Sequence, residues 1–191
     1  MDEIPFRGMF FEPSEGWGPA PNECDQTGLM NLDAYAENYY KSAMELVTRA
    51  NDDRLLTSTF GHPIVFLYRQ YIELALKDLV SLLRRLETHD SGYPQTHSLH
   101  SLWSEAKRLI NQHYREDQMP DGIKHVDQCV NEFHNLDSQS DAFRYPHSKK
   151  GKVYDPPRFD LPHLRDGMRE VERFLGTVRG DLFHKWQNSP Y

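Results

Sequence analysis

The stretch IVFLYRQYIELALKDLVSLLRRL, from Ile64 to Leu86, decides the fold that we expect for this chain. It follows Pro63, which favours the first turn of a helix, and it contains neither Gly nor Pro. Apolar side chains would occupy nearly the whole circumference of this helix, so other helices must cover it on several sides. The stretch therefore predicts the central helix of a bundle.

Four polar residues of this helix are spaced four apart, which places them in one line along its surface: Arg69, Glu73, Lys77 and Ser81. We call these four residues the polar line. An unpaired charge is costly inside a bundle, so the line must meet solvent, opposite charges or a second subunit. We therefore expect a site along it.

Four further segments have apolar residues three or four positions apart, and none reads convincingly as a strand. The first of them ends at residues 51–53, and a short connection joins it to the central helix. The expected inward residues are Leu32, Tyr35, Tyr39, Ala43, Leu46 and Ala50, then Leu99, Leu102, Trp103, Ala106, Leu109 and Ile110, then Ile123, Val126, Val130, Phe133 and Leu136, and finally Leu164, Met168, Val171, Leu175, Val178 and Leu182. The fold class is predicted to be all-α, an antiparallel bundle of about five helices.

Residues 1–30 differ from the rest because they are rich in Pro and Gly, which excludes a long helix. They also hold Phe6, Phe10, Phe11 and Trp17, too many aromatic residues for a plain disordered tail. We predict an extended, irregular N-terminal arm (1–30), packed on the helical domain (31–191) or on a protein partner.

The composition narrows the class of protein. The chain has 191 residues, 38% of them hydrophobic, and its mean hydropathy is −0.77, so no membrane protein is expected. No secretory signal is visible at the N-terminus, and we expect a cytoplasmic protein. Its two Cys residues, far apart, do not suggest a disulfide framework or a cysteine zinc site. The net charge of −7 argues against binding nucleic acid through the overall field, although residues 141–159 are locally basic.

Three segments together are similar to one family. They are Tyr68–Lys77 in the central helix, Pro94–Leu102 around the start of the next, and Ala142–Pro146 after the fourth. In this order and with these gaps they resemble the HEPN domain, over about residues 35–190. The resemblance implies an antiparallel helical bundle, frequently a homodimer, from bacterial defence, toxin–antitoxin or RNA-processing systems. Many members are metal-independent ribonucleases, and others serve as binding or assembly modules.

The catalytic signature that the resemblance implies is an Arg and a His with four to six residues between them. Arg179 and His184 match that spacing, although they lie away from the Arg-Tyr-Pro turn at Arg144. A His can move the proton of an RNA 2′-hydroxyl, and an Arg can stabilise charge on the phosphate. In a regular helix, however, a five-residue step turns side chains by about 140°. The alternative is that both are ordinary exposed residues near a helix end.

Arg144 has two readings. In the structural one it makes a two-pronged contact with Glu73, which joins the end of the fourth helix to the polar line. In the functional one Arg144, His147, Lys149 and Lys150 bind a phosphate or nucleotide beside Arg69, Glu73 and Lys77. The structural role is the stronger expectation, and one arrangement can serve both.

His97 and His100 are spaced like metal ligands, but nothing fixes a third ligand beside them, so no metal or cofactor is expected. A capping role for residues 96–98 is preferred, and Ser98 stands where the HEPN pattern usually has Asp. The leading hypothesis is an HEPN-like homodimer that acts on or binds RNA or nucleotide. It would be a degenerate metal-independent endoribonuclease. The alternative is a non-catalytic helical assembly module, which binds a protein partner.

Overall fold

The structure of the protein is a computed structural model that describes residues 32–52, 54–88, 92–137, 142–145, 147, 151, 153–154 and 160–188. The predicted arm (1–30), Lys149 and Lys150 lie outside these residues, so their predictions stay untested. The helical unit comprises Leu32–Tyr191.

The expected all-α fold is confirmed. The described residues form α1 (Leu32–Asp52), α2 (Arg54–Thr88), α3 (Leu99–His113), α4 (Ile123–Leu136) and α5 (Leu161–Gln187), with one 3₁₀ turn, η2 (Glu116–Gln118). His147 and Val153 form an isolated antiparallel bridge between α4 and α5. None of the described helices has the length and apolarity needed to cross a membrane.

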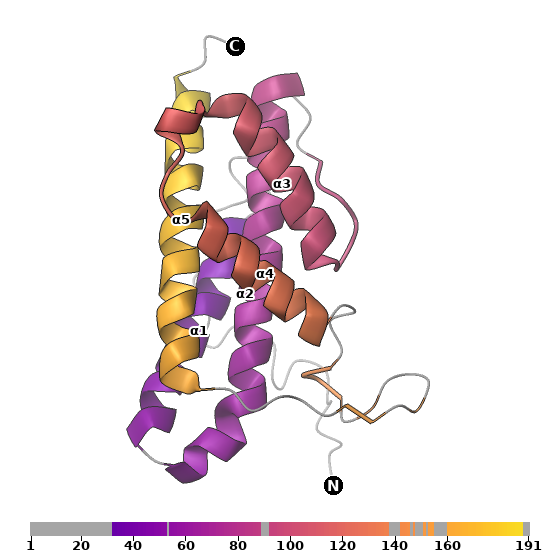
Figure 1. The fold of residues 1–191 in the computed structure, drawn as a ribbon, viewed down its shortest axis with the longest axis vertical. Coiled ribbons are helices and arrows are strands. Elements are labelled where there is room, and N and C mark those ends of the chain that lie inside the picture. Colours follow the sequence, from indigo (N-terminus) through magenta and orange to yellow (C-terminus); the bar gives the residue numbers. More distant parts are fainter. Residues whose placement is uncertain are drawn as a thin grey trace, which may run out of the picture. The chain divides into compact units, whose positions relative to one another are not determined.

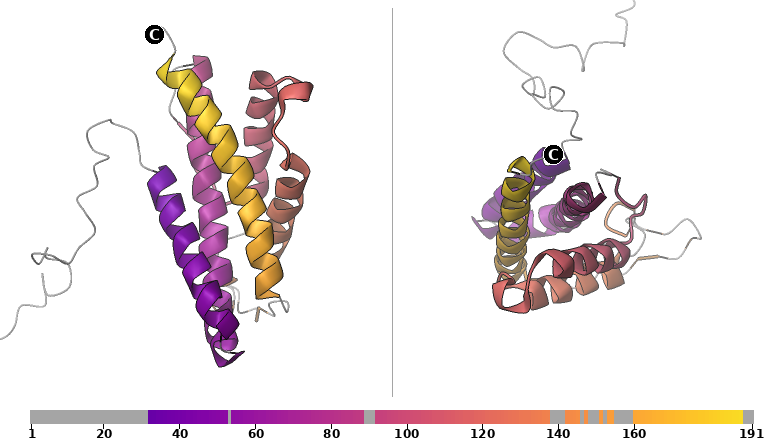
Figure 2. Two further views of the ribbon diagram at one scale, coloured as in Figure 1. Left: turned by 90° about the vertical axis from the view of Figure 1, so that its left-hand side faces the viewer. Right: turned by 90° about the horizontal axis from the view of Figure 1, so that it is seen from above.

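The long helix α2 is the centre of the bundle, as its sequence predicts. It packs against α1, α3 and α5, while α4 lies against α3 and α5 (Figure 1 and Figure 2). Its buried apolar residues spread around the helix because neighbours cover more than one side. They are Ile64, Val65, Tyr68, Tyr71, Ile72, Leu76, Leu79, Val80, Leu82 and Leu83.

The predicted start of this helix is wrong. It begins at Arg54 and not after Pro63, and only residue 53 separates it from α1. Pro63 therefore lies inside α2, where it has no N–H to donate to the preceding turn. Ile64, Val65 and Tyr68 just beyond it are buried, so tertiary packing holds the helix together across the proline.

Two inward assignments are also wrong. Tyr35 of α1 is 54% exposed and Leu136 of α4 is 42% exposed. In α1 the neighbouring Ala36 is buried instead, together with Ala43, Val47 and Ala50. Ala43 and Ala50 were predicted inward, so the buried face of α1 overlaps the predicted face and is shifted from Tyr35 toward Ala36 and Val47.

Helix α5 begins after Asp160, whose side chain caps it by accepting a hydrogen bond of 2.9 Å from the His163 N–H. Five residues of its predicted seam are buried, namely Met168, Val171, Leu175, Val178 and Leu182, and Leu164 is half-buried. Phe174 joins them, with its ring edge-on to Trp103 of α3 at a centroid distance of 6.2 Å. The pattern of the sequence did not single out this residue.

We expect alanine to have opposite effects at two glycines. Gly180 lies inside α5, and a Cβ added there would meet no atom within 4 Å. Gly180→Ala should therefore raise the free energy of unfolding by about 0.5–1 kcal/mol. Gly122, at the start of α4, has a φ of +118°, so Gly122→Ala should lower it by about 1–3 kcal/mol. Urea unfolding of both variants checks the signs, and a stabilised Gly122→Ala would contradict the backbone argument.

Candidate functional site

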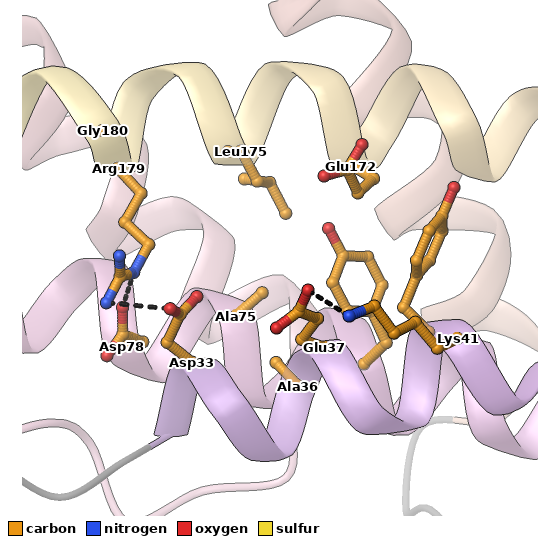
Figure 3. A pocket seen from close by; sticks show the side chains of 13 residues that line it. Asp33, Ala36, Glu37, Lys41, Ala75, Asp78, Glu172, Leu175, Arg179 and Gly180 are labelled. Carbon is orange, nitrogen blue, oxygen red and sulfur yellow. Dashed lines mark hydrogen bonds and ion pairs between the residues drawn. The ribbon is translucent and has the colours of Figure 1, made fainter. Parts of the chain in front are cut away.

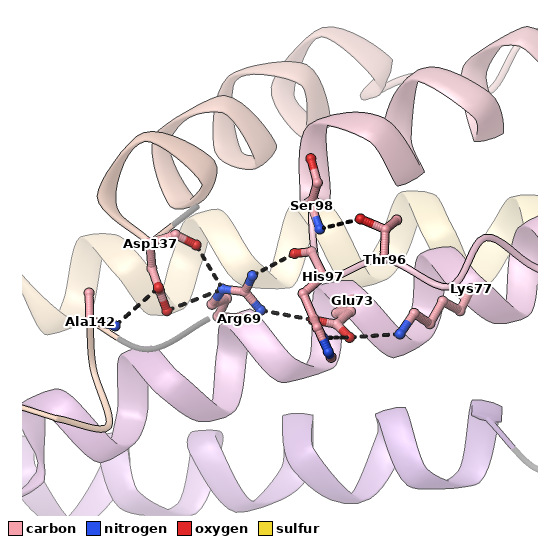
Figure 4. Close-up of polar contacts among 8 residues, drawn as sticks. All are labelled: Arg69, Glu73, Lys77, Thr96, His97, Ser98, Asp137 and Ala142. Atoms are coloured by element: carbon pink, nitrogen blue, oxygen red, sulfur yellow. Dashed lines mark hydrogen bonds and ion pairs between the residues drawn. The ribbon is translucent and has the colours of Figure 1, made fainter. Parts of the chain in front are cut away.

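Three members of the polar line are buried. Arg69 is 0% exposed, Glu73 is 1% exposed and Lys77 is 9% exposed, so the charges sit inside the bundle. The sequence allowed these charges to meet solvent, opposite charges or a second subunit. Figure 4 shows that they meet opposite charges. A buried charge is tolerable when hydrogen bonds and counter-charges satisfy it, and here both are present.

Arg69 connects three parts of the chain. Its Nη1 donates to Glu73 Oε2 over 2.9 Å within α2, and its Nη2 donates to the His97 carbonyl over 2.7 Å. Its Nε donates to the Asp137 carbonyl over 3.2 Å and lies 3.3 Å from the Asp137 carboxylate. Asp137 is the C-cap of α4, where a cation is favourable because the helix dipole is negative. The Asp137 side chain also accepts a hydrogen bond from the Ala142 N–H (3.1 Å), so the cluster extends into the following turn.

Glu73 is bound on both oxygens. Its Oε1 accepts from Lys77 Nζ over 2.8 Å and lies 2.9 Å from His97 Nδ1, while Oε2 accepts from Arg69. The predicted two-pronged contact with Arg144 is therefore wrong: among the described residues, Glu73 is bound by Lys77, Arg69 and His97. The end of α4 does meet the polar line, but with the signs reversed, since α4 brings the carboxylate of Asp137 and α2 brings the cation.

The side chain of His97 is 71% exposed, although its Nδ1 is bound to buried Glu73. A carboxylate only accepts hydrogen bonds, so Nδ1 is the donor. His97 is held by the turn before α3, where the Ser98 side chain accepts from the Ser101 N–H over 3.2 Å. The predicted capping role of Ser98 is confirmed. His100 instead faces His134, with ring centroids 5.7 Å apart. Within the described ranges no three His, Cys, Asp or Glu residues are grouped to hold a metal ion.

The contacts of Glu73 predict a pH dependence. Burial acts to raise the pKa of its carboxyl, but hydrogen bonds from Lys77 and Arg69 outweigh burial, and the pKa is lowered from 4.5. A lowered folded-state pKa contributes stability that is present above the unfolded pKa and is lost as the pH falls through the folded pKa. The stability gap between the wild type and Glu73→Gln should therefore be constant from about pH 7 to 5 and narrow below about 4.5. Urea unfolding across this range measures the gap, and a gap that widens in acid would contradict the ion pairs.

Arg144 lies at an exposed corner. Its guanidinium is 5.8 Å from the ring centroid of Phe66 and 5.6 Å from that of Tyr145, which is 56% exposed. His147, two residues after Tyr145, is also exposed. Of the predicted phosphate-binding residues, the structure thus groups Arg69, Glu73 and Lys77 in the interior, and it places Arg144 and His147 at the surface.

The pair Arg179 and His184 lies on one regular helix, α5, so their side chains leave it about 140° apart. Arg179 points to α1 and α2, as Figure 3 shows. Its Nε donates to Asp78 Oδ2 over 2.7 Å, and its Nη2 lies 3.0 Å from Asp33 Oδ2. His184 is exposed, and its carbonyl accepts from the Asn188 side chain over 2.8 Å. The structure does not bring the two side chains together within the chain.

The two carboxylates bound to Arg179 share one positive charge. Burial raises the pKa of both Asp33 and Asp78 from 3.8, although Arg179 acts in the opposite direction. Asp33 also raises the pKa of Asp78 through its own negative charge. One guanidinium faces two carboxylates, so the ionised groups of this region carry more negative than positive charge.

Sequence reasoning missed Asp137, Asp33 and Asp78. Asp137 carried a usable signal, since a carboxylate at the end of a predicted helix is unfavourable unless a cation meets it. Asp78 and Asp33 carried none, because their contact with Arg179 depends on how three helices are rotated. Comparisons of the chain with protein-family models, with curated proteins and with solved structures find no match.

Proposed function

We propose that this chain is a non-catalytic, HEPN-like helical module that works by binding, in a bacterial defence or toxin–antitoxin type of system. The family is proposed from the three sequence segments given above. The resemblance assigns catalysis to Arg179. In the structure this residue is paired with two carboxylates, which favours binding over catalysis.

The observation that carries the proposal is the double ion pair of Arg179 with Asp78 and Asp33. A catalytic Arg must offer its N–H groups to the developing charge on a phosphate. Here a phosphate would have to displace two carboxylates, and it would approach a region of excess negative charge. Arg69 and Lys77 are likewise occupied, by Glu73 and Asp137, which supports a structural role for them.

The test is an incubation of the purified chain with mixed RNA in the presence of chelator. We expect the RNA to stay intact with the wild type, and we expect Arg179→Ala and His184→Ala to behave in the same way. Cleavage by the wild type that is lost in His184→Ala, with an unchanged melting temperature, would overturn the proposal and establish a metal-independent endoribonuclease. His184 is exposed, so its replacement is a fair test that leaves the core intact.

RNA or nucleotide binding is the second candidate, and one observation favours it. Exposed Tyr145 beside Arg144 offers a ring and a guanidinium on which a base can stack. Fluorescence anisotropy with single-stranded RNA tests this, and Tyr145→Ala should weaken binding by about 1–3 kcal/mol. Arg144→Ala and His147→Ala should reduce the salt dependence of the affinity for RNA. If all three variants bind RNA as tightly as the wild type, this corner is not part of an RNA-binding site.

The resemblance also leads us to propose a homodimer. Sedimentation velocity over a range of concentrations measures the assembly state directly. A dimer would matter for the nuclease question, because the resemblance implies that both subunits contribute catalytic residues. A monomer at all concentrations would count against the family and would favour a module that binds other chains.

A further inference from the structure

A cavity of about 420 Å³ lies where α1, α2 and α5 meet (Figure 3). It exists because small residues line it from all three helices, and these are Ala36, Ala75, Gly176 and Gly180. Its volume falls at the lower end of the range of small-molecule sites, about 300–1,000 Å³. Leu175 gives it an apolar wall.

The charged residues of the cavity are mostly acidic. Two of its four carboxylates, Asp33 and Asp78, share Arg179. Glu37 is bound by Lys41 over 2.6 Å. The fourth, Glu172, forms no ion pair or hydrogen bond with the described part of the chain, and its Oε1 lies beside Gly176. The cavity therefore carries an excess of negative charge, and Glu172 is the carboxylate left to bind a ligand.

A largely buried tyrosine also lines the cavity. Tyr71 is only 5% exposed and lines it, yet its hydroxyl forms no hydrogen bond within the described ranges. Burial and, after it, the negative charge of Glu172 raise the pKa of Tyr71 well above 10, with smaller contributions from Tyr40 and Asp33, and both carboxylates line the same cavity. The hydroxyl oxygen is therefore open to the cavity, where it can accept a hydrogen bond from a ligand with N–H groups. The ring of Tyr40, 5.1 Å from that of Tyr71, extends the aromatic wall.

We propose that this cavity binds an alkylammonium group, with Glu172 as the counter-charge, the Tyr71 hydroxyl as hydrogen-bond acceptor and the tyrosine rings and Leu175 against the alkyl chain. Ammonium groups are attracted both by carboxylates and by aromatic faces. Arg179 and its two carboxylates line this cavity too, but amine binding goes beyond the proposed function and does not depend on whether the chain binds RNA.

Other ligand classes fit less well. An anion would meet the excess negative charge. A metal ion needs several close ligands, and no such group occurs among the described residues. The alkylammonium has two natural sources, a free amine or the lysine side chain of a protein, and both present the same chemistry to the cavity.

Calorimetric titration of the full chain tests the site with three probes. They are 1,4-diaminobutane, a blocked tripeptide with a central lysine, and 1,4-butanediol as the uncharged control. We expect at least one of the two ammonium probes to bind and the diol not to bind. A diamine that binds alone would assign the site to free amines, and a peptide that binds better would assign it to a protein lysine.

Variants show where the probe binds. Glu172→Gln should weaken binding by about tenfold or more, because a charge-assisted hydrogen bond is lost. Glu170→Gln is the matched control: it removes the same charge from the same helix, but Glu170 is exposed, pairs with Arg173 and does not line the cavity. Gly180→Leu should abolish binding by filling the cavity. No binding of either ammonium probe, or equal losses in Glu172→Gln and Glu170→Gln, would overturn the proposal.

Discussion

Replacing Arg69 by methionine is expected to lower the free energy of unfolding by about 3–5 kcal/mol. Methionine fills much of the same space but has no charge, so Glu73 and Asp137 keep their buried carboxylates and lose their shared cation. The carbonyls of His97 and Asp137 lose their donors in the same step. Urea unfolding followed by circular dichroism measures the change, and the slope of the transition should stay the same.

Arg49→Met is the matched control. Arg49 and Glu45 are also four residues apart in a helix and 3.0 Å apart, but their side chains are 65% and 63% exposed. An exposed pair of this spacing contributes about 0.3–0.5 kcal/mol, so this variant should unfold almost like the wild type. If Arg69→Met is as mild as Arg49→Met, then the polar line is hydrated and does not hold the bundle together.

A double-mutant cycle separates the pair from its surroundings. Glu73→Gln alone leaves Arg69 with Asp137, and Arg69→Met alone leaves Glu73 with Lys77. The combined variant should lose less stability than the sum of the two, because each single change already removes their mutual contact. Strict additivity would mean that the 2.9 Å contact between Arg69 and Glu73 adds nothing to stability.

The sequence predicts the helices well because each one repeats its apolar residues with the period of a helix. All six inward residues of α3 are buried, from Leu99 to Ile110. The prediction fails where tertiary packing overrides a local rule. A proline usually stands in the first turn of a helix. Pro63 nevertheless lies inside α2, because buried residues beyond it hold the helix together.

The partners of the charged residues were harder to predict than the helices. Two acceptors of Arg69 are backbone carbonyls, which every residue possesses, so no side-chain pattern identifies them. The contact of Arg179 with Asp33 depends on the rotation of α1, where Tyr35 was predicted inward although its neighbour Ala36 is the buried residue. A small error in the rotation of a helix leaves the helix correct but changes which of its side chains meet a neighbour.

Phe174→Ala is the second change with a large expected effect, a loss of about 3–5 kcal/mol. Phe174 is fully buried and lies edge-on to Trp103 of α3. A Cβ placed on Gly122 would come within 3.4 Å of its Cβ, so the start of α4 packs against the same side chain. Truncation therefore leaves a cavity where α3, α4 and α5 meet, and the rigid helices cannot collapse to fill it.

Phe183→Ala on the same helix is the comparison. The ring of Phe183 is half-buried and contacts the Trp186 ring at 5.6 Å, near the end of α5. Solvent fills part of the space that its removal creates, so the loss should be clearly smaller than at Phe174. Equal losses would mean that the end of α5 is packed as tightly as its middle. A mild Phe174→Ala would mean that α3, α4 and α5 do not share one rigid core at this point.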